Sequence, residues 1–288
     1  MNAPQPIHVL VPVDLGPSSE AALRCAQTLG NAFGARLTLM YVDDALTLQD
    51  YDDIYAGYRE IPDEQSWMLA DQVSQWARRI VGRDAKYDVL VAADDPARAI
   101  ATAAARRDAS LIVMGTHRRS GWDRLMGGSL AEAVLHRTDR PVMTVPKEAG
   151  NAMAGIVCPV DFSDGARRAT RTACSVGTIF NANLHLLHVG EKPVPQLAQR
   201  LREWAGAALT RHCNVHEIVA RGHAAAERIA EYASSVTADA IVVGAEQRTH
   251  GERAALGTTT ERIMRSAPVA VMSVVRPFTL SASMVGAA

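Results

Sequence analysis

Residues 9–14 read VLVPVD, and residues 156–161 read IVCPVD. Residues 37–42 read LTLMYV, and residues 184–189 read LHLLHV. Both pairs are separated by the same 147 positions (156 − 9 and 184 − 37). A repeat of this length indicates a whole domain that was copied once, rather than a solenoid of short units.

The spacing between the two copies changes further along the chain. ASLIVMG at 109–115 matches ADAIVVG at 238–244, and this pair is 129 positions apart (244 − 115). The first copy therefore contains extra residues between its second and fourth apolar runs. We expect this insertion at the acidic stretch DDALTLQDYDDIYAGYRE, residues 43–60.

The boundary between the copies is expected at the small-residue, polar segment KEAGNAMAG, residues 147–155. This gives two domains, residues 1–148 and residues 149–288. The length of 288 residues agrees with two domains, because about 150 residues is typical of one. Apolar residues make up 48% of the chain and charged residues 21%, which excludes disordered and fibrous proteins.

Short apolar runs alternate with amphipathic segments in both copies. The runs are apolar on both faces, as in parallel strands that helices cover on each side. Segment 64–82 places Leu69, Val73 and Trp76 on one face of an expected helix, and 196–210 is its counterpart. This alternation predicts an α/β fold of two Rossmann-like domains, each with five parallel strands and four helices. The predicted strands are 7–13, 36–42, 87–93, 110–114 and 141–145, then 155–160, 183–189, 215–220, 239–243 and 268–274.

Composition and charge narrow the class of protein. Lys and Arg number 30 against 31 Asp and Glu, so no basic field exists to attract nucleic acid or acidic lipid. The N-terminus lacks the pattern of a signal peptide, and no apolar stretch approaches the roughly 18 residues of a membrane helix. Four cysteines without a CxxC pair indicate reduced thiols in a cytoplasmic protein.

A carboxylate follows the first strand of each copy. Asp14 ends the first PVD triplet, and Asp161 ends the second. Ligands of open parallel sheets bind beyond the C-terminal ends of the strands, where a carboxylate can accept hydrogen bonds from an adenine amino group or a sugar hydroxyl. The alternative is a helix cap, since Gly16 before Pro17, and Ser163, are good capping residues.

A second pattern follows the fourth strand. Gly115 and Gly244 end that strand in the two copies, and Gly128-Ser129 or Gly257-Thr258 follows thirteen positions later. Glycine allows a ligand to approach the backbone closely, and the amides at a helix N-terminus suit phosphate. The alternative is a turn followed by a helix with Ser129 or Thr258 as its N-cap.

Together, PVD after the first strand and the glycine loop after the fourth resemble the universal stress protein family. The resemblance extends over roughly residues 7–146 and 154–275. It implies adenine nucleotide alpha hydrolase-like domains, with a five-stranded parallel sheet of order 3-2-1-4-5. It also implies ATP or a related adenine nucleotide, with Mg²⁺, as a ligand that some members bind. By the same resemblance, the two domains would pair with each other through their last strands, 141–145 and 268–274, as single-domain members pair in dimers. The whole chain could in addition form a homodimer.

The resemblance assigns the site residue by residue. The strand-1 Asp lies at the adenine, a residue that ends strand 2 lines the base pocket, and the loop glycines with Ser or Thr hold ribose and phosphates. The residues at these positions are Asp14, Val42, Gly115, Gly128 and Ser129 in the first copy, and Asp161, Val189, Gly244, Gly257 and Thr258 in the second.

Both copies depart from the family pattern at its second glycine, which is Arg118 in the first copy and Gln247 in the second. Arg118 can crowd the phosphates or neutralise them, because a guanidinium matches phosphate geometry. Gln247 has no charge, and Glu246 beside it repels an anion. The first copy is therefore the better candidate for nucleotide binding.

Other chemistry has little support. The chain has no GxxxxGK[ST] loop and no GxGxxG after the first strand, so a fast ATPase is not expected. His185 and His188 lie three apart in one strand and should point to opposite faces, which disfavours a metal pair. The expectation is a stress-response regulator that binds adenine nucleotide, has no catalytic residues and acts on an unknown protein partner. The alternatives are a nucleotide-free adaptor or chaperone-like protein, and a slow ATP hydrolase.

Overall fold

The computed structural model describes residues 7–43, 59–60, 64–116, 130–205, 213–219, 225–245, 248–250, 253–255 and 257–276. The chain divides into two compact units, Met1–Lys147 and Glu148–Ala288. Most of the acidic stretch 43–60 lies outside the described residues. None of the helices in the described ranges is long and apolar enough to cross a membrane.

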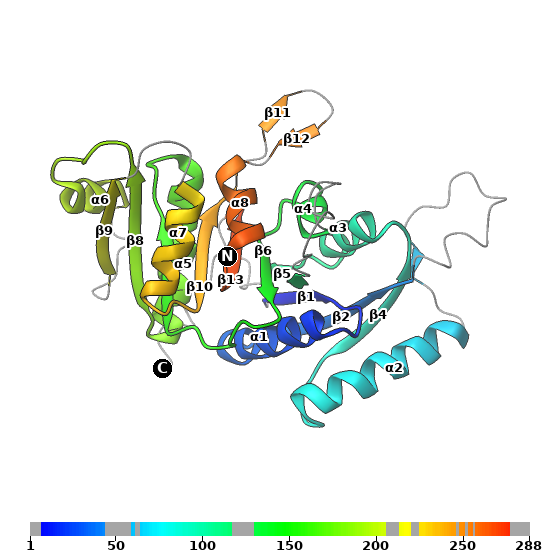
Figure 1. Cartoon of the computed structure of the whole chain (residues 1–288). Coiled ribbons are helices and arrows are strands. Elements are labelled where there is room, and N and C mark those ends of the chain that lie inside the picture. The colour runs from blue at the N-terminus through cyan, green and yellow to red at the C-terminus, as the bar shows by residue number, and fades with distance from the viewer. Residues whose placement is uncertain are drawn as a thin grey trace, which may run out of the picture. The chain divides into compact units, whose positions relative to one another are not determined.

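The first unit is a parallel sheet with two helices on each face (Figure 1). Its strand order is β3-β4-β2-β1-β5-β6, and β3 alone pairs antiparallel with its neighbour. Figure 1 shows α1 and α2 below this sheet and α3 and α4 above it. The strands are β1 (His8–Pro12), β2 (Arg36–Val42), β3 (Arg59–Glu60), β4 (Asp88–Ala93), β5 (Leu111–Thr116) and β6 (Val142–Pro146). The helices are α1 (Pro17–Phe33), α2 (Glu64–Val81), α3 (Pro96–Arg106) and α4 (Leu130–Leu135).

The second unit repeats this architecture. Its main sheet has the order β13-β10-β7-β8-β9, and all its described pairings are parallel. The strands are β7 (Gly155–Pro159), β8 (Asn183–Gly190), β9 (Cys213–Val219), β10 (Ala240–Gly244) and β13 (Ala270–Val274). The helices are α5 (Asp164–Phe180), α6 (Leu197–Ala205), α7 (Ala225–Ser235) and α8 (Thr258–Ser266). A separate antiparallel hairpin is formed by β11 (Arg248–His250) and β12 (Arg253–Ala255).

The predicted α/β fold with helices on both faces is confirmed, and the structure adds two elements to it. The edge strand β3 has two residues, and the hairpin of β11 and β12 has three in each strand. These segments read RE, RTH and RAA, and none of them is an apolar run. Because the strands were predicted from apolar runs, such short polar segments gave no signal.

Matching capping positions set the ends of the first helix in both units. Gly16 is the N-cap of α1 before Pro17, whereas the Ser163 hydroxyl accepts a hydrogen bond from the Ala166 N–H at 3.1 Å to cap α5. Gly34 ends α1 in the left-handed conformation (φ 60°), and Asn181 does so for α5 (φ 49°). Glycine and asparagine are the residues that adopt this conformation at least cost.

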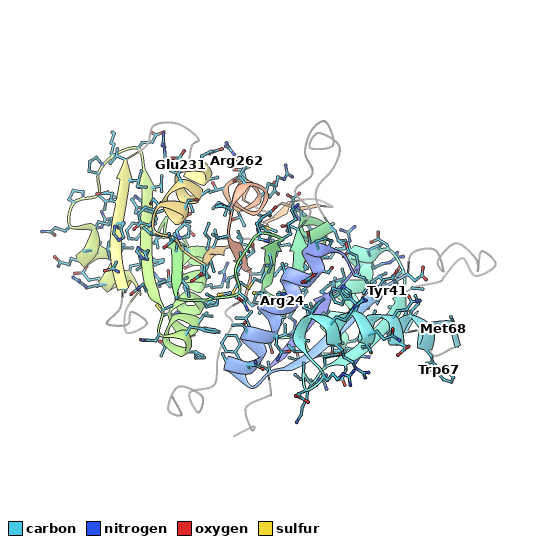
Figure 2. The ribbon with its side chains drawn as sticks, turned by 60° about the horizontal axis from the view of Figure 1, so that its bottom comes forward. Arg24, Tyr41, Trp67, Met68, Glu231 and Arg262 are labelled. Atoms are coloured by element: carbon cyan, nitrogen blue, oxygen red, sulfur yellow. The ribbon has the colours of Figure 1, made fainter. Side chains whose placement is uncertain are left out.

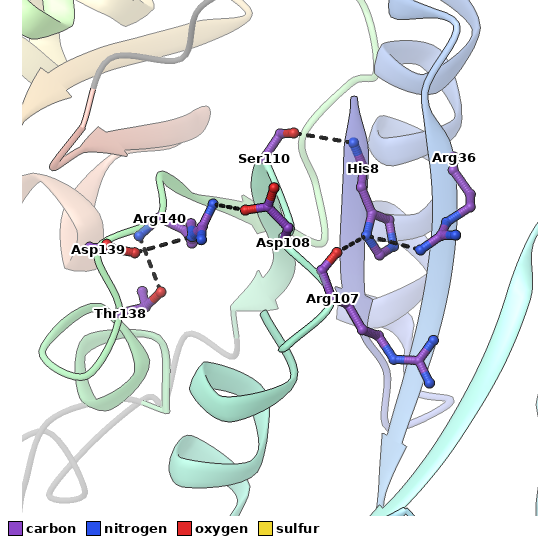
Figure 3. A network of polar contacts seen from close by, with 8 residues as sticks. All are labelled: His8, Arg36, Arg107, Asp108, Ser110, Thr138, Asp139 and Arg140. Carbon is purple, nitrogen blue, oxygen red and sulfur yellow. Dashed lines mark hydrogen bonds and ion pairs between the residues drawn. The ribbon is translucent and has the colours of Figure 1, made fainter. Parts of the chain in front are cut away.

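The base of the first sheet contains a buried histidine (Figure 3). The side chain of His8 has its Nδ1 2.9 Å from the carbonyl oxygen of Arg107 and its Nε2 2.8 Å from the Thr38 hydroxyl. Since a carbonyl can only accept, Nδ1 donates to Arg107, and in the neutral ring that burial favours, Nε2 accepts from the Thr38 hydroxyl. Burial lowers the pKa of His8, and the nearby charge of Arg36 lowers it further, despite the opposing hydrogen bond to Arg107.

This histidine makes folding sensitive to acid. The native pKa of His8 lies below the unfolded value of about 6.5, so its contribution to stability is present above that pH and lost as the pH falls through the native pKa. We expect the free energy of unfolding to fall less steeply between about pH 7 and about pH 5 in His8→Gln than in the native chain. Urea denaturation at a series of pH values measures this, and identical slopes would refute it.

Candidate functional site

The winding of each sheet reverses beside its first strand. In the first unit β1 lies between β2 and β5, and in the second unit β7 lies between β8 and β10. The crevice beyond the C-terminal ends of such strands is the usual ligand site of open α/β sheets. In the first unit, the start of α1 and the end of β5 contact each other at this crevice, because the Ser18 hydroxyl donates to the Thr116 carbonyl over 3.0 Å.

Asp14 lies at this reversal point and is held by its own turn. Its Oδ1 accepts hydrogen bonds from the Gly16 N–H at 2.9 Å and from the Ser19 hydroxyl at 2.6 Å. Leu15, between them, has a left-handed backbone with φ 63°. A non-glycine residue in this conformation stores strain, which is characteristic of functional sites. The turn therefore presents a carboxylate in one fixed orientation at the end of β1.

The second unit repeats this turn with fewer contacts. The Ser163 N–H donates to Asp161 Oδ1 at 3.0 Å, and Phe162 has φ 64°. The position that corresponds to Ser19 is Ala166 (19 + 147), which has no hydroxyl. Asp161 is exposed. The carboxylate of the second unit is consequently held by one hydrogen bond fewer than that of the first.

The glycines near the C-terminal ends of β5 and β10 have a packing role. A Cβ atom at Gly115 would lie under 3.0 Å from the backbone carbonyl of Ser18, and one at Gly244 equally close to the backbone of Gly165. These glycines thus let the first turn of α1 or α5 pass directly over the strand end. This packing accounts for both glycines, and their assignment to the nucleotide site stays a prediction.

At the start of α8 the helix cap differs from the predicted alternative, and the anion cup there stays a prediction. Gly257 is the N-cap and Thr258 the first helical residue, with no side-chain hydrogen bond to the cap. A Cβ at Gly257 would meet no atom within 4 Å. The Thr260 hydroxyl donates to the Gly244 carbonyl at 2.9 Å and so holds this helix end at the end of β10. Within the described residues, the amides at the start of α8 thus have no side-chain cap from Gly257, and no atom lies where its Cβ would be.

Several predicted site residues lie at other strand ends or outside the described residues. Val42 is the last residue of β2, and Val189 is the last but one of β8. The structure does not describe Arg118, Gly128, Ser129 and Gln247, so their roles stay predictions. Among the residues it does describe, no group of three or more His, Cys, Asp or Glu could hold a metal ion.

An aromatic cluster at the ends of β7 and β8 was not predicted. The ring of Phe162 lies 5.6 Å from that of His188 and 5.7 Å from that of Trp204, between centroids. His185 points to the other face and contacts Tyr232 of α7, which confirms that the two histidines of β8 diverge. The only signal in the sequence was Trp204, and its spacing on the helix indicated a core position.

A buried carboxylate at the end of β4 was also missed. The Asp94 side chain is fully buried and forms an ion pair with Arg98 of α3. Burial alone would raise the pKa of Asp94, but hydrogen bonds from Arg98 and from the Asp95 N–H outweigh it, so the pKa lies below its usual range. The adjacent Asp95 caps α3 by accepting from the Arg98 N–H at 3.0 Å. Two consecutive aspartates before Pro96 indicate a cap, but not which of them is buried.

Comparison with known proteins identifies the family. The model of the universal stress protein family matches the chain twice, over residues 7–146 and 153–275.

Individual relatives cover different shares of the chain. A universal stress protein of Mycobacterium tuberculosis (strain ATCC 25618 / H37Rv) is 29% identical over 140 residues. These residues are 49% of this chain and 45% of that relative, so the match spans less than half of the relative's length. The crystal structure of a universal stress protein from Archaeoglobus fulgidus DSM 4304 is 24% identical, with a TM-score of 0.71 over 93% of this chain and 97% of that one. A universal stress protein in complex with cAMP is 24% identical and covers 43% of this chain and 98% of its own, with a TM-score of 0.36. Because the family model matches both halves, this chain belongs to the universal stress protein family, as a tandem member.

Proposed function

We propose that the chain is a stress-response regulator that binds ATP or a related adenine nucleotide, with Mg²⁺, at the reversal point of the first unit and more weakly in the second. The observation that carries this proposal is the Asp14 turn. Its carboxylate is fixed by Gly16 and Ser19 at the position where such folds bind ligands. Neither unit has a Walker lysine, so binding rather than turnover is proposed.

The proposed difference in nucleotide affinity between the two units rests on the charge of the loop after the fourth strand and on the turn after the first strand. Asp161 is held by one hydrogen bond fewer than Asp14, and Gln247 with Glu246 replaces the cationic Arg118 of the first loop. The uncapped start of α8 is the feature that favours phosphate in the second unit. We therefore propose that nucleotide occupies the first unit at lower concentration than the second.

We predict that Gly128→Val weakens ATP affinity more than Gly257→Val does. Valine at either position would fill the cup beside the phosphates, and the first unit contributes more of the binding. A Cβ at Gly257 meets nothing within 4 Å, so a lost affinity there reports on the ligand rather than on folding. Isothermal titration decides this, with thermal unfolding of the apoprotein as the check on folding. Equal losses would contradict the asymmetry.

Nucleotide binding itself is tested by mass spectrometry of the ligand released when the purified protein is denatured in acid. An adenine nucleotide in the supernatant supports the proposal. A protein that releases none, and that shows no heat on titration with ATP, overturns it. Turnover well above that of the Ser129→Ala and Asp14→Ala double variant would indicate a slow hydrolase instead.

A nucleotide-free adaptor is the second candidate, and one observation favours it. Trp67 and Met68 on α2 are 67% and 68% exposed, and Figure 2 shows both side chains at one end of that helix. Large exposed apolar side chains that lie together mark sites of protein contact. An adaptor would bind its partner without ATP, whereas a nucleotide-responsive regulator would change its affinity for that partner when ATP is added.

The proposal also covers the compartment in which the protein works and its oligomeric state. All four cysteines are free thiols, which supports a reducing compartment such as the cytoplasm. The pairing of the domains through their last strands, and a homodimer, stay predictions, and analytical ultracentrifugation with and without ATP tests the latter.

A further inference from the structure

The aromatic cluster of the second unit carries two arginines on its rings. The guanidinium carbon of Arg167 lies 5.3 Å from the ring centre of Trp204, and that of Arg200 lies 5.4 Å from the ring centre of Phe162. These four residues, with His188, are called the α5–α6 cluster below. A guanidinium that stacks on a ring keeps its in-plane N–H groups available for an acceptor.

Two donors of the cluster lack acceptors. Arg167 Nε and Trp204 Nε1 are both buried, and neither has a hydrogen-bond partner among the residues that the structure describes. Both atoms can only donate, so the group that would satisfy them is an acceptor. Buried polar atoms without partners are uncommon in folded proteins, and an ion or another ligand is one of the few reasons for them.

Arginines predominate on the α5 side of the cluster, although Asp164 lies one turn before them and Glu203 lies beside Trp204. Arg167, Arg168 and Arg171 lie on α5, and within the described part of the chain none of them forms an ion pair. Arg167 and Arg171 are one helical turn apart, where like charges repel. The nearest acidic residues along the chain, Asp161 and Asp164, precede them at the start of α5.

The same positions of the first unit are neutralised. Glu20 corresponds to Arg167 (167 − 147), and its carboxylate accepts a hydrogen bond at 2.8 Å from Arg24, which corresponds to Arg171. Leu15 takes the place of Phe162, and Tyr41 that of His188. Where the first unit has an ion pair on its surface, the second unit therefore has a group of cations beside aromatic rings.

We infer that the α5–α6 cluster binds an oxyanion, a phosphate or carboxylate group, through Arg167, Arg200 and Trp204. The anion accepts from the two unpartnered donors and offsets the repulsion on α5. This site involves α5 and α6, and not the amides at the start of α8. Phe162 and His188 adjoin Asp161 and Val189 of the proposed nucleotide site, so the test must separate the two sites.

The indole N–H resonance of Trp204 in nitrogen-15 NMR spectra of the full chain tests this site. The resonance is identified by its loss in Trp204→Phe, and the protein is freed of nucleotide beforehand. The probes are inorganic phosphate and acetate, each titrated against chloride at matched ionic strength. We expect phosphate, acetate or both to shift this resonance to saturation, with affinity reduced at least about tenfold in an Arg167→Gln and Arg200→Gln double variant.

Two control variants make the result specific. Arg78→Gln with Arg79→Gln removes two exposed arginines from α2 and should leave the titration unchanged. Gly257→Val should also leave it unchanged, whatever that variant does to ATP affinity, so failure of this site and failure of the nucleotide site can be told apart. Saturation by phosphate alone identifies a phosphate group as the ligand, and saturation by acetate identifies a carboxylate. No shift beyond that of chloride, or an equal shift in the arginine double variant, overturns the inference.

Discussion

Replacing Gly115 by alanine should lower the free energy of unfolding by about 3 kcal/mol, the upper end of the usual cost of overpacking. The added Cβ would lie under 3.0 Å from backbone atoms of Ser18, and backbone cannot move aside as a flexible side chain can. Relief requires α1 to shift away from β5, which also disturbs the hydrogen bond from Ser18 to Thr116. Gly244→Ala should do the same in the second unit, where the clash is with Gly165.

Guanidinium denaturation followed by circular dichroism measures this loss, and α5 offers a matched control. A Cβ at Gly177, inside that helix, meets no atom within 4 Å. Because alanine is a better helix former than glycine by about 1 kcal/mol, Gly177→Ala should raise stability. The explanation by close packing fails if the Gly115 and Gly177 variants change stability equally.

Replacing Arg98 by methionine should lower the free energy of unfolding by about 2 kcal/mol at neutral pH, because it leaves a buried carboxylate without its cation. The Asp94 side chain is fully buried, while Arg98 is 56% exposed, so water screens part of the loss. Removing a comparable cation from the exposed pair of Arg24 and Glu20 should cost only about 0.5 kcal/mol.

The pH dependence of this effect has a definite sign. The native pKa of Asp94 is lowered, so its pairing stabilises the fold above the usual carboxyl pKa of about 3.9 and ceases to do so as the pH falls through the native pKa. The difference in stability between the native chain and Arg98→Met should therefore be largest near neutral pH and shrink at acid pH, as the pH falls through the native pKa of Asp94. A double variant, Asp94→Asn with Arg98→Met, should recover part of the loss. An equal difference at both pH values would show that the aliphatic stem of Arg98, and not its charge, matters.

Local patterns were sufficient to predict most of the fold. The buried runs of β1 and β7 lie 147 positions apart and pair with their neighbours in equivalent registers. The helix that follows each run has its own start signal, Pro17 for α1 and Ser163 for α5. Contacts between distant residues could not be read in the same way. That Gly115 accommodates Ser18, across almost a hundred positions, depends on how closely a helix passes over a strand, and no periodicity encodes that distance.

The candidate site, too, could be predicted where a local pattern marks it, but not where it depends on contacts between distant residues. Asp14 and Asp161 could be placed at strand ends from their triplets alone. The burial of Asp94, and the stacking of Arg167 on Trp204 and of Arg200 on Phe162, depend on side-chain directions from different elements. Comparing the copies position by position would have revealed part of this, because Glu20 and Arg167 have opposite charge.

The left-handed residues Leu15 and Phe162 have a consequence for attempts to engineer the protein. Glycine would adopt the backbone angles of Leu15 without strain, so this substitution should stabilise the turn, whereas glycine at Phe162 would also remove the ring that packs against His188 and Trp204. The Leu15 variant would gain heat resistance and lose the rigid presentation of the neighbouring carboxylate.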